Sequence, residues 1–200
     1  MRAALLFCYE ALTVFLPCAA LLPARRRRYV RPASWYAWLA AFAVYVLLTL
    51  HLTEAGTLWD GLARGFGIQR GQINLIPFSR EMDISYPANV LLFLPFGWLA
   101  PRLWKKWDSM RRIAAAAFCL SLLIEASQLL NARFSDVDDL IINTAGALIG
   151  YALFCRVSRP AERPRPDAPL WEMPLYLGAM LAGHFLLFNE LAAAGALFGF

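Results

Sequence analysis

The sequence predicts an all-α polytopic membrane helix bundle with about six transmembrane helices. Hydrophobic residues make up 60% of the 200-residue chain and charged residues only 16%, whereas soluble domains are roughly 45–50% apolar and about 25% charged. The apolar residues are gathered into long runs, as in membrane-spanning helices. The basic residues fall in every second loop between these runs, as in multi-pass proteins. These observations exclude a soluble enzyme and a disordered chain.

Six apolar segments account for most of the chain, and each is expected to form a helix. They are Ala3–Leu22, Ala33–Thr53, Pro87–Ala100, Ile113–Leu130, Leu140–Cys155 and Leu170–Leu191. The first is interpreted as a retained helix and not as a signal peptide, because one basic residue, Arg2, precedes it while Arg25–Arg28 follow it. The third and fifth segments are short for a span, and each extends into the polar residues at its outer end.

The distribution of positive charge predicts the orientation. Most of the 19 lysines and arginines lie in three short loops, at residues 25–31, 102–112 and 156–165. Short loops rich in Lys and Arg remain on the cytoplasmic side of a membrane. We therefore expect both termini to be extracytoplasmic, together with the loops 54–86 and 131–138.

The loop 54–86 contains a candidate interfacial helix. Leu58, Trp59, Leu62 and Phe66 recur in it at roughly helical spacing. An amphipathic helix with such a face lies in the plane of the membrane surface. The alternative is an exposed loop that is anchored at the head-group level by a few aromatic residues.

By composition the chain divides into four parts. Residues 1–32 form an N-terminal helix with a basic cytoplasmic loop, and residues 33–155 form the membrane core. Residues 156–169 are a Pro- and Arg-rich cytoplasmic linker, and residues 170–200 contain a C-terminal transmembrane helix.

Polar side chains from several segments reach one level of one leaflet in the predicted topology. The candidate ligand-binding residues are Asn74, Arg80, Asn89, Glu125, Gln128, Arg133, Asp136, Asp138, Asp139 and Asn143. Ionisable residues inside a membrane are costly and are functional-site candidates by default. We therefore expect these residues to line an outward-facing polar pocket.

Helical spacing places small residues below this polar level. Asp139 and Asn143 are four residues apart and share a helix face. Gly146 and Gly150 continue the same stripe, and Gly97 belongs to a comparable stripe on the third segment. Small residues four apart let two membrane helices approach closely. The sequence thus predicts tight packing between helices beneath the polar residues.

The acidic residues also have structural interpretations. Asp136, Asp138 and Asp139 begin a helix, where carboxylates cap free N–H groups and complement the helix dipole. Glu125 lies near the C-terminal end of its helix, where a carboxylate is unfavourable without a partner. Arg133 is the candidate partner across the short loop. Glu125 and Arg133 form either a structural ion pair or part of a binding cavity.

Other polar residues are interpreted as structural. Glu10 in the first segment is expected to pair with a neighbouring helix, and His184 in the last segment is interpreted as a satisfied buried histidine. His51 and Glu54 have the spacing of a ligand pair, but they stand alone and favour a polar helix end. Asn189 is expected to mark the outer end of the last span.

Four motifs, taken in order and spacing, carry a family resemblance. They are Asn74–Phe78 (NLIPF), Asn89–Gly97 (NVLLFLPFG), Ser121–Gln128 (SLLIEASQ) and Arg133–Gly146 (RFSDVDDLIINTAG). Over about residues 45–155 the sequence resembles the VanZ-like family of bacterial multi-pass membrane proteins. The resemblance implies the bacterial plasma membrane, a role in the cell envelope, and an association with antibiotic resistance, namely low-level resistance to the lipoglycopeptide teicoplanin. It implies no particular reaction.

The favoured function is binding of an amphiphile from outside the membrane. The ligands that fit are a membrane lipid head group, a lipid-linked envelope precursor and a lipoglycopeptide. Arg80 and Arg133 would pair with phosphate, and the amide side chains would supply neutral hydrogen bonds. No cofactor is expected. Nucleic acid is not expected as a partner, because the basic loops are short and no recognition module accompanies them.

An intramembrane metal-dependent hydrolase or phosphatase acting on a lipid-linked substrate is the alternative. Glu125, Asp136, Asp138 and Asp139 would then hold a hard cation, which prefers oxygen ligands, and one carboxylate would act as general base. The chain has no His-rich ligand set, no nucleophile motif and no C-x-x-C spacing, so no metal site is expected. A transporter or proton relay is disfavoured, because the inner halves of the apolar segments lack polar residues. The remaining hypothesis is a protein with a purely structural role toward a partner protein.

Overall fold

The structure is a computed structural model of the chain, and it describes residues 2–28, 31–69, 71–79, 85–158 and 167–198. Its helices are α1 (Arg2–Arg28), α2 (Ala33–Leu52), α3 (Leu58–Arg64), α4 (Ser85–Leu103), α5 (Met110–Gln128), α6 (Val137–Val157), α7 (Glu172–Leu187) and α8 (Glu190–Phe198). Two strands of two residues each, β1 (Ile73–Asn74) and β2 (Ser135–Asp136), pair in parallel. The predicted all-α bundle is confirmed.

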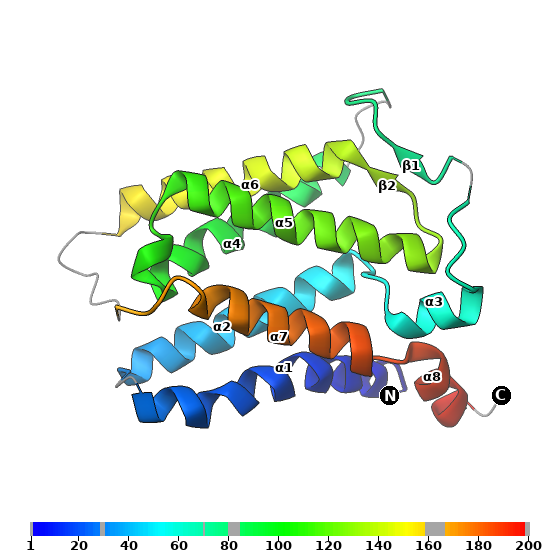
Figure 1. Cartoon of the computed structure of the whole chain (residues 1–200), viewed down its shortest axis with the longest axis horizontal. Helices are drawn as coiled ribbons and strands as arrows, with labels where there is room; N and C mark the ends of the chain where they lie inside the picture. The colour runs from blue at the N-terminus through cyan, green and yellow to red at the C-terminus, as the bar shows by residue number, and fades with distance from the viewer. Residues whose placement is uncertain (1, 29–30, 70, 80–84, 159–166, 199–200) are drawn as a thin grey trace.

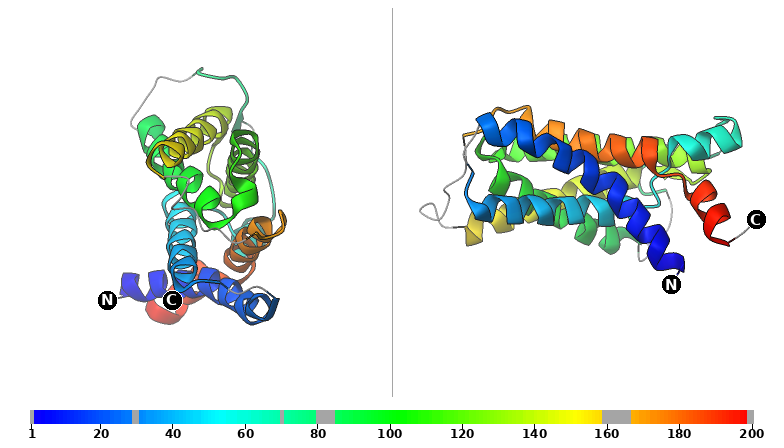
Figure 2. Two further views of the ribbon diagram at one scale, coloured as in Figure 1. Left: turned by 90° about the vertical axis from the view of Figure 1, so that its left-hand side faces the viewer. Right: turned by 90° about the horizontal axis from the view of Figure 1, so that it is seen from below.

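The long helices lie side by side and run between two ends of an elongated molecule (Figure 1). Seen along the bundle, α4, α5 and α6 form one group, and α1 lies on the far side of α2 and α7 from it (Figure 2). The first and last described residues, α3, α8 and both strands lie at one end, here called the terminal end. The C-terminal ends of α1, α4 and α6 lie at the other, the basic end. The described termini and the basic end thus lie at opposite ends of the bundle, and the side of the membrane that each end faces stays a prediction.

Four helices among the described residues are long and apolar enough to cross a membrane. They are α1 over Arg2–Arg25, α2, α6, and α5 continued to Asn131. Helices α7 and α8 pass the same test together as a bent pair, which makes up to five spans. Helix α4 has 19 residues and lies alongside them, and it begins at Ser85 within its polar flank, as expected. The chain is thus a polytopic membrane protein by the length and composition of its helices.

The last predicted segment, Leu170–Leu191, contains α7 and the first residues of a second helix, α8, which the sequence did not predict. Helix α7 ends at Leu187, α8 begins at Glu190, and the two are bent by 51°. The side chain of Asn189 accepts a hydrogen bond from the Ala192 N–H at 2.9 Å, which is how an N-cap residue starts a new helix. Asn189 does mark the end of the straight part of the span.

Helices α4 and α6 pack through their glycines. A Cβ atom built on Gly97 would lie 1.8 Å from the carbonyl oxygen of Ala147. One built on Gly146 would lie 2.4 Å from the carbonyl oxygen of Val90. Any larger side chain at these positions would therefore push the two backbones apart. The close packing predicted from the small-residue stripe is confirmed.

A buried ion pair fastens α7 to the bundle near the basic end. Nη2 of Arg31 lies 2.8 Å from both carboxylate oxygens of Glu172, and Nε1 of Trp104 donates to the same carboxylate at 3.1 Å. The guanidinium of Arg31 also stacks over the ring of Trp35 at 4.7 Å. Each of these polar groups compensates the cost of burying the others. Through these contacts α7 is joined to the core that the other helices form.

The candidate interfacial helix is present as a helix, α3. Thr57 and Asp60 form a capping box at its start, and Gly65 ends it with φ of 80°. Trp59 donates from Nε1 to the carbonyl of Leu186 at 3.0 Å, so α3 is attached to the end of α7. Its position on the membrane surface stays a prediction.

Candidate functional site

Most of the predicted site residues meet around the first turn of α6. Asp136 is the N-cap of α6, and its Oδ1 accepts from the Asp138 N–H at 3.0 Å. Its Oδ2 accepts from Nδ2 of Asn74 at 3.0 Å, and Asn74 stands opposite Asp136 in the β1–β2 pair. The structural interpretation of Asp136 as a helix cap is therefore confirmed.

Asp138 fastens a loop and α4 to the start of α6. Its side chain is 1% exposed. It accepts hydrogen bonds from the N–H of Phe78 at 2.8 Å and from the hydroxyl of Tyr86. Tyr86 was not among the predicted site residues, because a tyrosine at a helix start carries no signal in the sequence for a particular partner. Both oxygens of Asp138 are thus used within the chain.

Two amides link α6 to α4 and α5. Nδ2 of Asn89 donates to Oδ1 of Asp139, and Nδ2 of Asn143 donates to Oγ of Ser121 at 2.9 Å. The Oδ1 atom of Asn143 is buried without a hydrogen-bond partner in the described part of the chain. The predicted helix face that carries Asp139 and Asn143 is therefore the face that contacts α4 and α5.

The proposed pairing of Glu125 with Arg133 is not found, and this interpretation is wrong. Glu125 is 4% exposed and accepts from the backbone N–H of Asp136 at 3.0 Å. Arg133 forms an ion pair with Glu54. The donor to Glu125 is thus the main-chain N–H of Asp136, three residues after Arg133, because strand β2 packs against α5. Gln128 donates to the carbonyl of Thr53 at 2.6 Å.

The ten predicted residues therefore separate into three groups. The acid–amide network comprises Asn74, Asn89, Glu125, Asp136, Asp138, Asp139 and Asn143. Gln128 and Arg133 contact the segment that follows α2. Arg80 lies outside the described residues. The hydrogen bonds of the network run between its own members and neighbouring groups, so it joins α4, α5 and α6 to the loop around β1.

The carboxylates of the network include the candidate ligands of a hard cation. Over the ranges that the structure describes, no group of three or more His, Cys, Asp or Glu side chains is arranged to hold a metal ion. The role of the acid–amide network as a ligand-binding site stays a prediction.

A second polar site, the polar cavity, lies at the terminal end. Its volume is about 660 Å³. Its walls come from the ends of α1, α2, α7 and α8, from α3, and from the turn before β2. Its ionisable lining residues are Glu10, His51, Glu54, Asp60, Arg64, Arg133, His184 and Glu190. Arg133 is the predicted site residue in this lining, among the residues that the structure describes.

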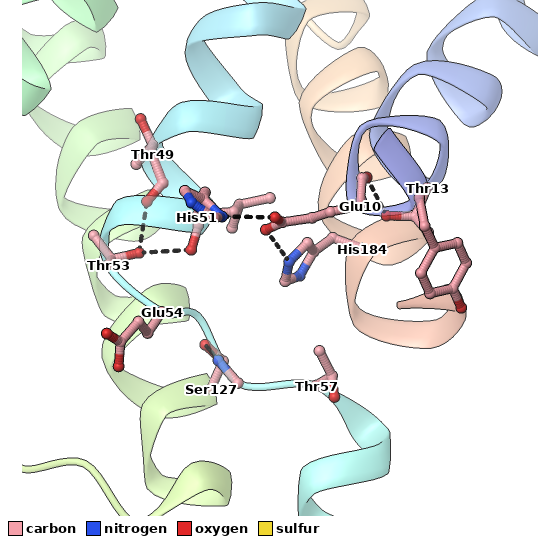
Figure 3. A network of polar contacts seen from close by, with 12 residues as sticks. Glu10, Thr13, Thr49, His51, Thr53, Glu54, Thr57, Ser127 and His184 are labelled. Carbon is pink, nitrogen blue, oxygen red and sulfur yellow. Dashed lines mark hydrogen bonds and ion pairs between the residues drawn. The ribbon is translucent and has the colours of Figure 1, made fainter. Parts of the chain in front are cut away.

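One carboxylate in this cavity joins three helices (Figure 3). Oε2 of Glu10 on α1 lies 2.7 Å from Nδ1 of His51 on α2, and Oε1 lies 3.2 Å from Nε2 of His184 on α7. Glu10 and His184 are buried, whereas the side chain of His51 is 47% exposed. We call these three residues the His–Glu–His bridge. The bridge compensates a carboxylate that would otherwise be costly to bury in a membrane helix.

The rim of the polar cavity is held by the chain that follows α2. Glu54 adopts a positive φ of 49°, and its carbonyl accepts from Nδ2 of Asn131 at 2.7 Å. Arg133 binds the Glu54 carboxylate from the same turn. Both side chains of this ion pair are substantially exposed, at 44% for Arg133 and 70% for Glu54. The pair therefore faces the cavity and remains accessible to a ligand.

An apolar cavity adjoins the polar one. Its volume is about 380 Å³, and Leu50, Ala55 and His184 line both cavities. Most of its remaining wall is apolar and comes from the ends of α5 and α7, including Ile124 and Phe185. A polar and an apolar space thus meet at the terminal end, with His184 between them.

The structural interpretations of Glu10 and His184 are confirmed, because Glu10 pairs with neighbouring helices and His184 is buried and hydrogen-bonded, but the sequence did not predict that these residues meet at one carboxylate. Glu10, His51 and His184 each carried a signal, since each is a titratable residue within or at the end of an apolar segment. Glu10 is 41 residues from one partner and 174 from the other. Their association could be seen only once α1, α2 and α7 were placed together.

Comparison with known protein families gives a match over most of the bundle. The sequence model of the VanZ/LLP1 family matches residues 35–158, which is more than half of the chain. This range includes α2 to α6 and the whole acid–amide network, whereas Glu10 and His184 lie outside it. No curated protein and no solved structure matches the chain significantly.

Proposed function

The chain belongs to the VanZ/LLP1 family, and from this premise we propose that it binds an amphiphile at the terminal end of the bundle. The polar cavity takes the head group, and the adjoining apolar cavity takes a hydrocarbon chain. The ligand classes that fit are a membrane lipid, a lipid-linked envelope precursor and a lipoglycopeptide antibiotic. All three carry a polar head and an apolar chain.

One observation carries the proposal, namely that the two cavities share a wall. Leu50, Ala55 and His184 line both of them. Ligand sites are typically concave, with volumes of roughly 300–1,000 Å³ and a few placed polar groups. A ligand that crossed this wall would bury its chain among apolar side chains and keep its head group among charged ones. Each cavity alone would accommodate only the polar part or only the apolar part of such a ligand.

The predicted orientation of the protein in the membrane favours a ligand that binds from the extracytoplasmic side. The terminal end is opposite to the loops that contain most of the basic residues, and such loops remain cytoplasmic. In the bacterial plasma membrane the two cavities would then open at the outer leaflet. A lipid, an envelope precursor or an antibiotic would all meet the protein there, which agrees with a role in the cell envelope and in resistance to teicoplanin.

The acid–amide network has a supporting role in this proposal. Its carboxylates accept hydrogen bonds from Asn74, Asn89, Tyr86 and backbone N–H groups. It thereby holds the start of α6 and the turn that carries Arg133. The predicted ligand residues of the network are therefore proposed as positioning residues, and Arg133 as a residue that contacts the ligand.

Native mass spectrometry of the protein released from mild detergent tests the proposal. We expect the wild type to carry a bound amphiphile. Ala182→Trp fills the apolar cavity, which Ala182 lines, and we expect this variant to lose the bound mass. The matched control is Ala152→Trp, because Ala152 is exposed on α6 and lines neither cavity. A wild type without any bound mass, or equal binding by both variants, would contradict the proposal.

A further inference from the structure

The polar cavity presents charges of both signs, and their pairing within the chain is uneven. Glu10 is occupied by the two histidines of the His–Glu–His bridge. Asp60 is occupied by the capping box of α3, since Oδ2 lies 2.8 Å from the N–H and from the hydroxyl of Thr57. These two carboxylates are therefore committed to the fold and offer little to a ligand.

The remaining charges are available to a ligand. Arg64 on α3 and Glu190 on α8 both line the cavity and are exposed. Neither side chain has a hydrogen bond or an ion pair with another described residue. Glu54 and Arg133 pair with each other, but both are largely exposed, and a guanidinium has five N–H donors, of which one carboxylate uses only some. The cavity thus offers two cations and two anions.

Such a lining suits a head group that carries both charges. An anionic head group would pair with Arg64 and Arg133, but its negative charge would lie close to the carboxylates of Glu54 and Glu190. This repulsion would lower the affinity of the cavity for a purely anionic lipid. A head group with a phosphate and a primary ammonium satisfies both sets. Guanidinium groups bind phosphate with matched geometry, and an ammonium group has three N–H donors for carboxylates.

We infer that the polar cavity binds the zwitterionic head group of a phospholipid that carries a phosphate and a primary ammonium. The phosphate lies against Arg64 and Arg133, the ammonium lies against Glu190 and Glu54, and one acyl chain enters the apolar cavity. This inference rests on the proposed function and names the ligand class for the same site. The adjoining apolar cavity favours a lipid over a soluble zwitterion, because a soluble molecule would leave that space unused.

The test uses delipidated full-length protein in detergent. It is equilibrated with phosphatidylethanolamine, phosphatidylcholine or phosphatidylglycerol of identical acyl chains, and native mass spectrometry measures the bound fraction. We expect phosphatidylethanolamine to bind roughly tenfold more tightly than the other two, because only its head group donates charge-assisted hydrogen bonds to carboxylates while its phosphate meets the arginines. Phosphatidylcholine keeps the positive charge but has no N–H donor.

Two substitutions separate the two halves of the head group. Glu190→Gln should remove most of the preference for phosphatidylethanolamine over phosphatidylglycerol. Arg64→Gln should weaken binding of all three lipids, because each contains a phosphate. The matched controls at the basic end are Asp167→Asn and Arg111→Gln, which change the same charges at exposed positions and should leave binding as in the wild type.

The outcomes distinguish this inference from the proposed function. Binding of all three lipids with equal affinity would overturn the head-group assignment and leave amphiphile binding in place. Preference for phosphatidylglycerol, or a Glu190→Gln variant with unchanged selectivity, would also overturn the assignment. Absence of binding by all three lipids, with folded protein, would overturn this inference, whereas the proposed function fails only if the protein released from mild detergent also carries no bound amphiphile.

Discussion

Single carboxylates decide how the helices are joined at the terminal end. Glu10 connects α1 to α2 and α7, and Asp138 connects α6 to Phe78 and to Tyr86 on α4. A buried carboxylate is costly unless donors surround it, so each of these groups specifies its neighbours. The acids that the sequence marked as unusual are therefore the points at which different helices meet.

At the residue scale we predict strong energetic coupling between Glu10 and His184. Removing one partner of a buried pair leaves the other uncompensated, so each single substitution to alanine should destabilise the protein, and the double substitution should cost less than the two added together. The expected coupling energy is about 1–3 kcal/mol. It is measured by a double-mutant cycle on unfolding in mixed micelles with increasing dodecyl sulfate, followed by circular dichroism.

The control for this cycle is the ion pair of Lys106 and Asp167 at the basic end. These side chains are 3.8 Å apart and exposed, so their coupling should be no more than about 0.5 kcal/mol. If Glu10 and His184 coupled no more strongly than this pair, the bridge would contribute nothing to holding α1 against α7.

At the element scale, α4 and α6 are the pair whose contact depends on the absence of side chains. Three glycines, Gly97, Gly146 and Gly150, place the backbone of one helix against the other. Helices in a membrane gain stability from close packing, since the surrounding lipid is as apolar as their side chains. The acid–amide network lies directly above this contact, on the same two helices and α5. Close packing below therefore positions the polar residues above.

We predict that Gly97→Ala destabilises the protein by about 1–3 kcal/mol, because a methyl group at this position overlaps the carbonyl oxygen of Ala147 and the helices must separate. Thermal unfolding in detergent, followed by tryptophan fluorescence, measures the effect. Gly178→Ala is the control, since a Cβ there meets no atom within 4 Å. In a helix interior it should be neutral or stabilising by up to about 1 kcal/mol. Equal effects of the two substitutions would show that the close contact between α4 and α6 does not contribute to the stability of the protein.

At the scale of the whole molecule, the two ends differ in chemistry. The basic end carries exposed Lys and Arg together with the buried pair of Arg31 and Glu172. The terminal end carries the acid–amide network, the polar cavity and both described termini. Helix α4 runs from the terminal end to the basic end, and α7 runs back toward the terminal end. The bent α7–α8 pair is the fifth candidate span by length and composition, and a membrane crossing by the shorter α4 stays a prediction.

The corresponding prediction concerns orientation. Alkaline phosphatase fused at the C-terminus should be active, because this enzyme folds only outside the cytoplasm and the basic loops are expected to stay inside. The same reporter fused within the connection between α4 and α5, near Asp108, should be inactive, whereas a fluorescent protein placed there should fluoresce. Fluorescence of a C-terminal fusion with inactive phosphatase would reverse the orientation and move the cavities to the cytoplasmic side.

The sequence by itself determined the features that depend on neighbouring residues. Apolar runs predicted the helices, spacing predicted the small-residue stripe, and the acids after Ser135 predicted the start of α6, with Asp136 capping the N–H of Asp138. It also located the polar end of the bundle, since that follows from where charges fall along each segment. The sequence predicted that the last span ends at Asn189, but it did not predict helix α8 or the 51° bend, because hydropathy continues through this point.

Only the tertiary structure decided which polar groups meet. Arg133 had Glu125 eight residues away in the sequence but pairs with Glu54, and Glu10 is joined to two histidines on distant helices. The physical reason is that a buried charge takes whichever partner the packing of helices brings within hydrogen-bonding distance. That packing depends on the rotation and placement of whole helices. The polar and apolar cavities arise in the same way, since their shared wall comes from α2, the segment that follows it and α7.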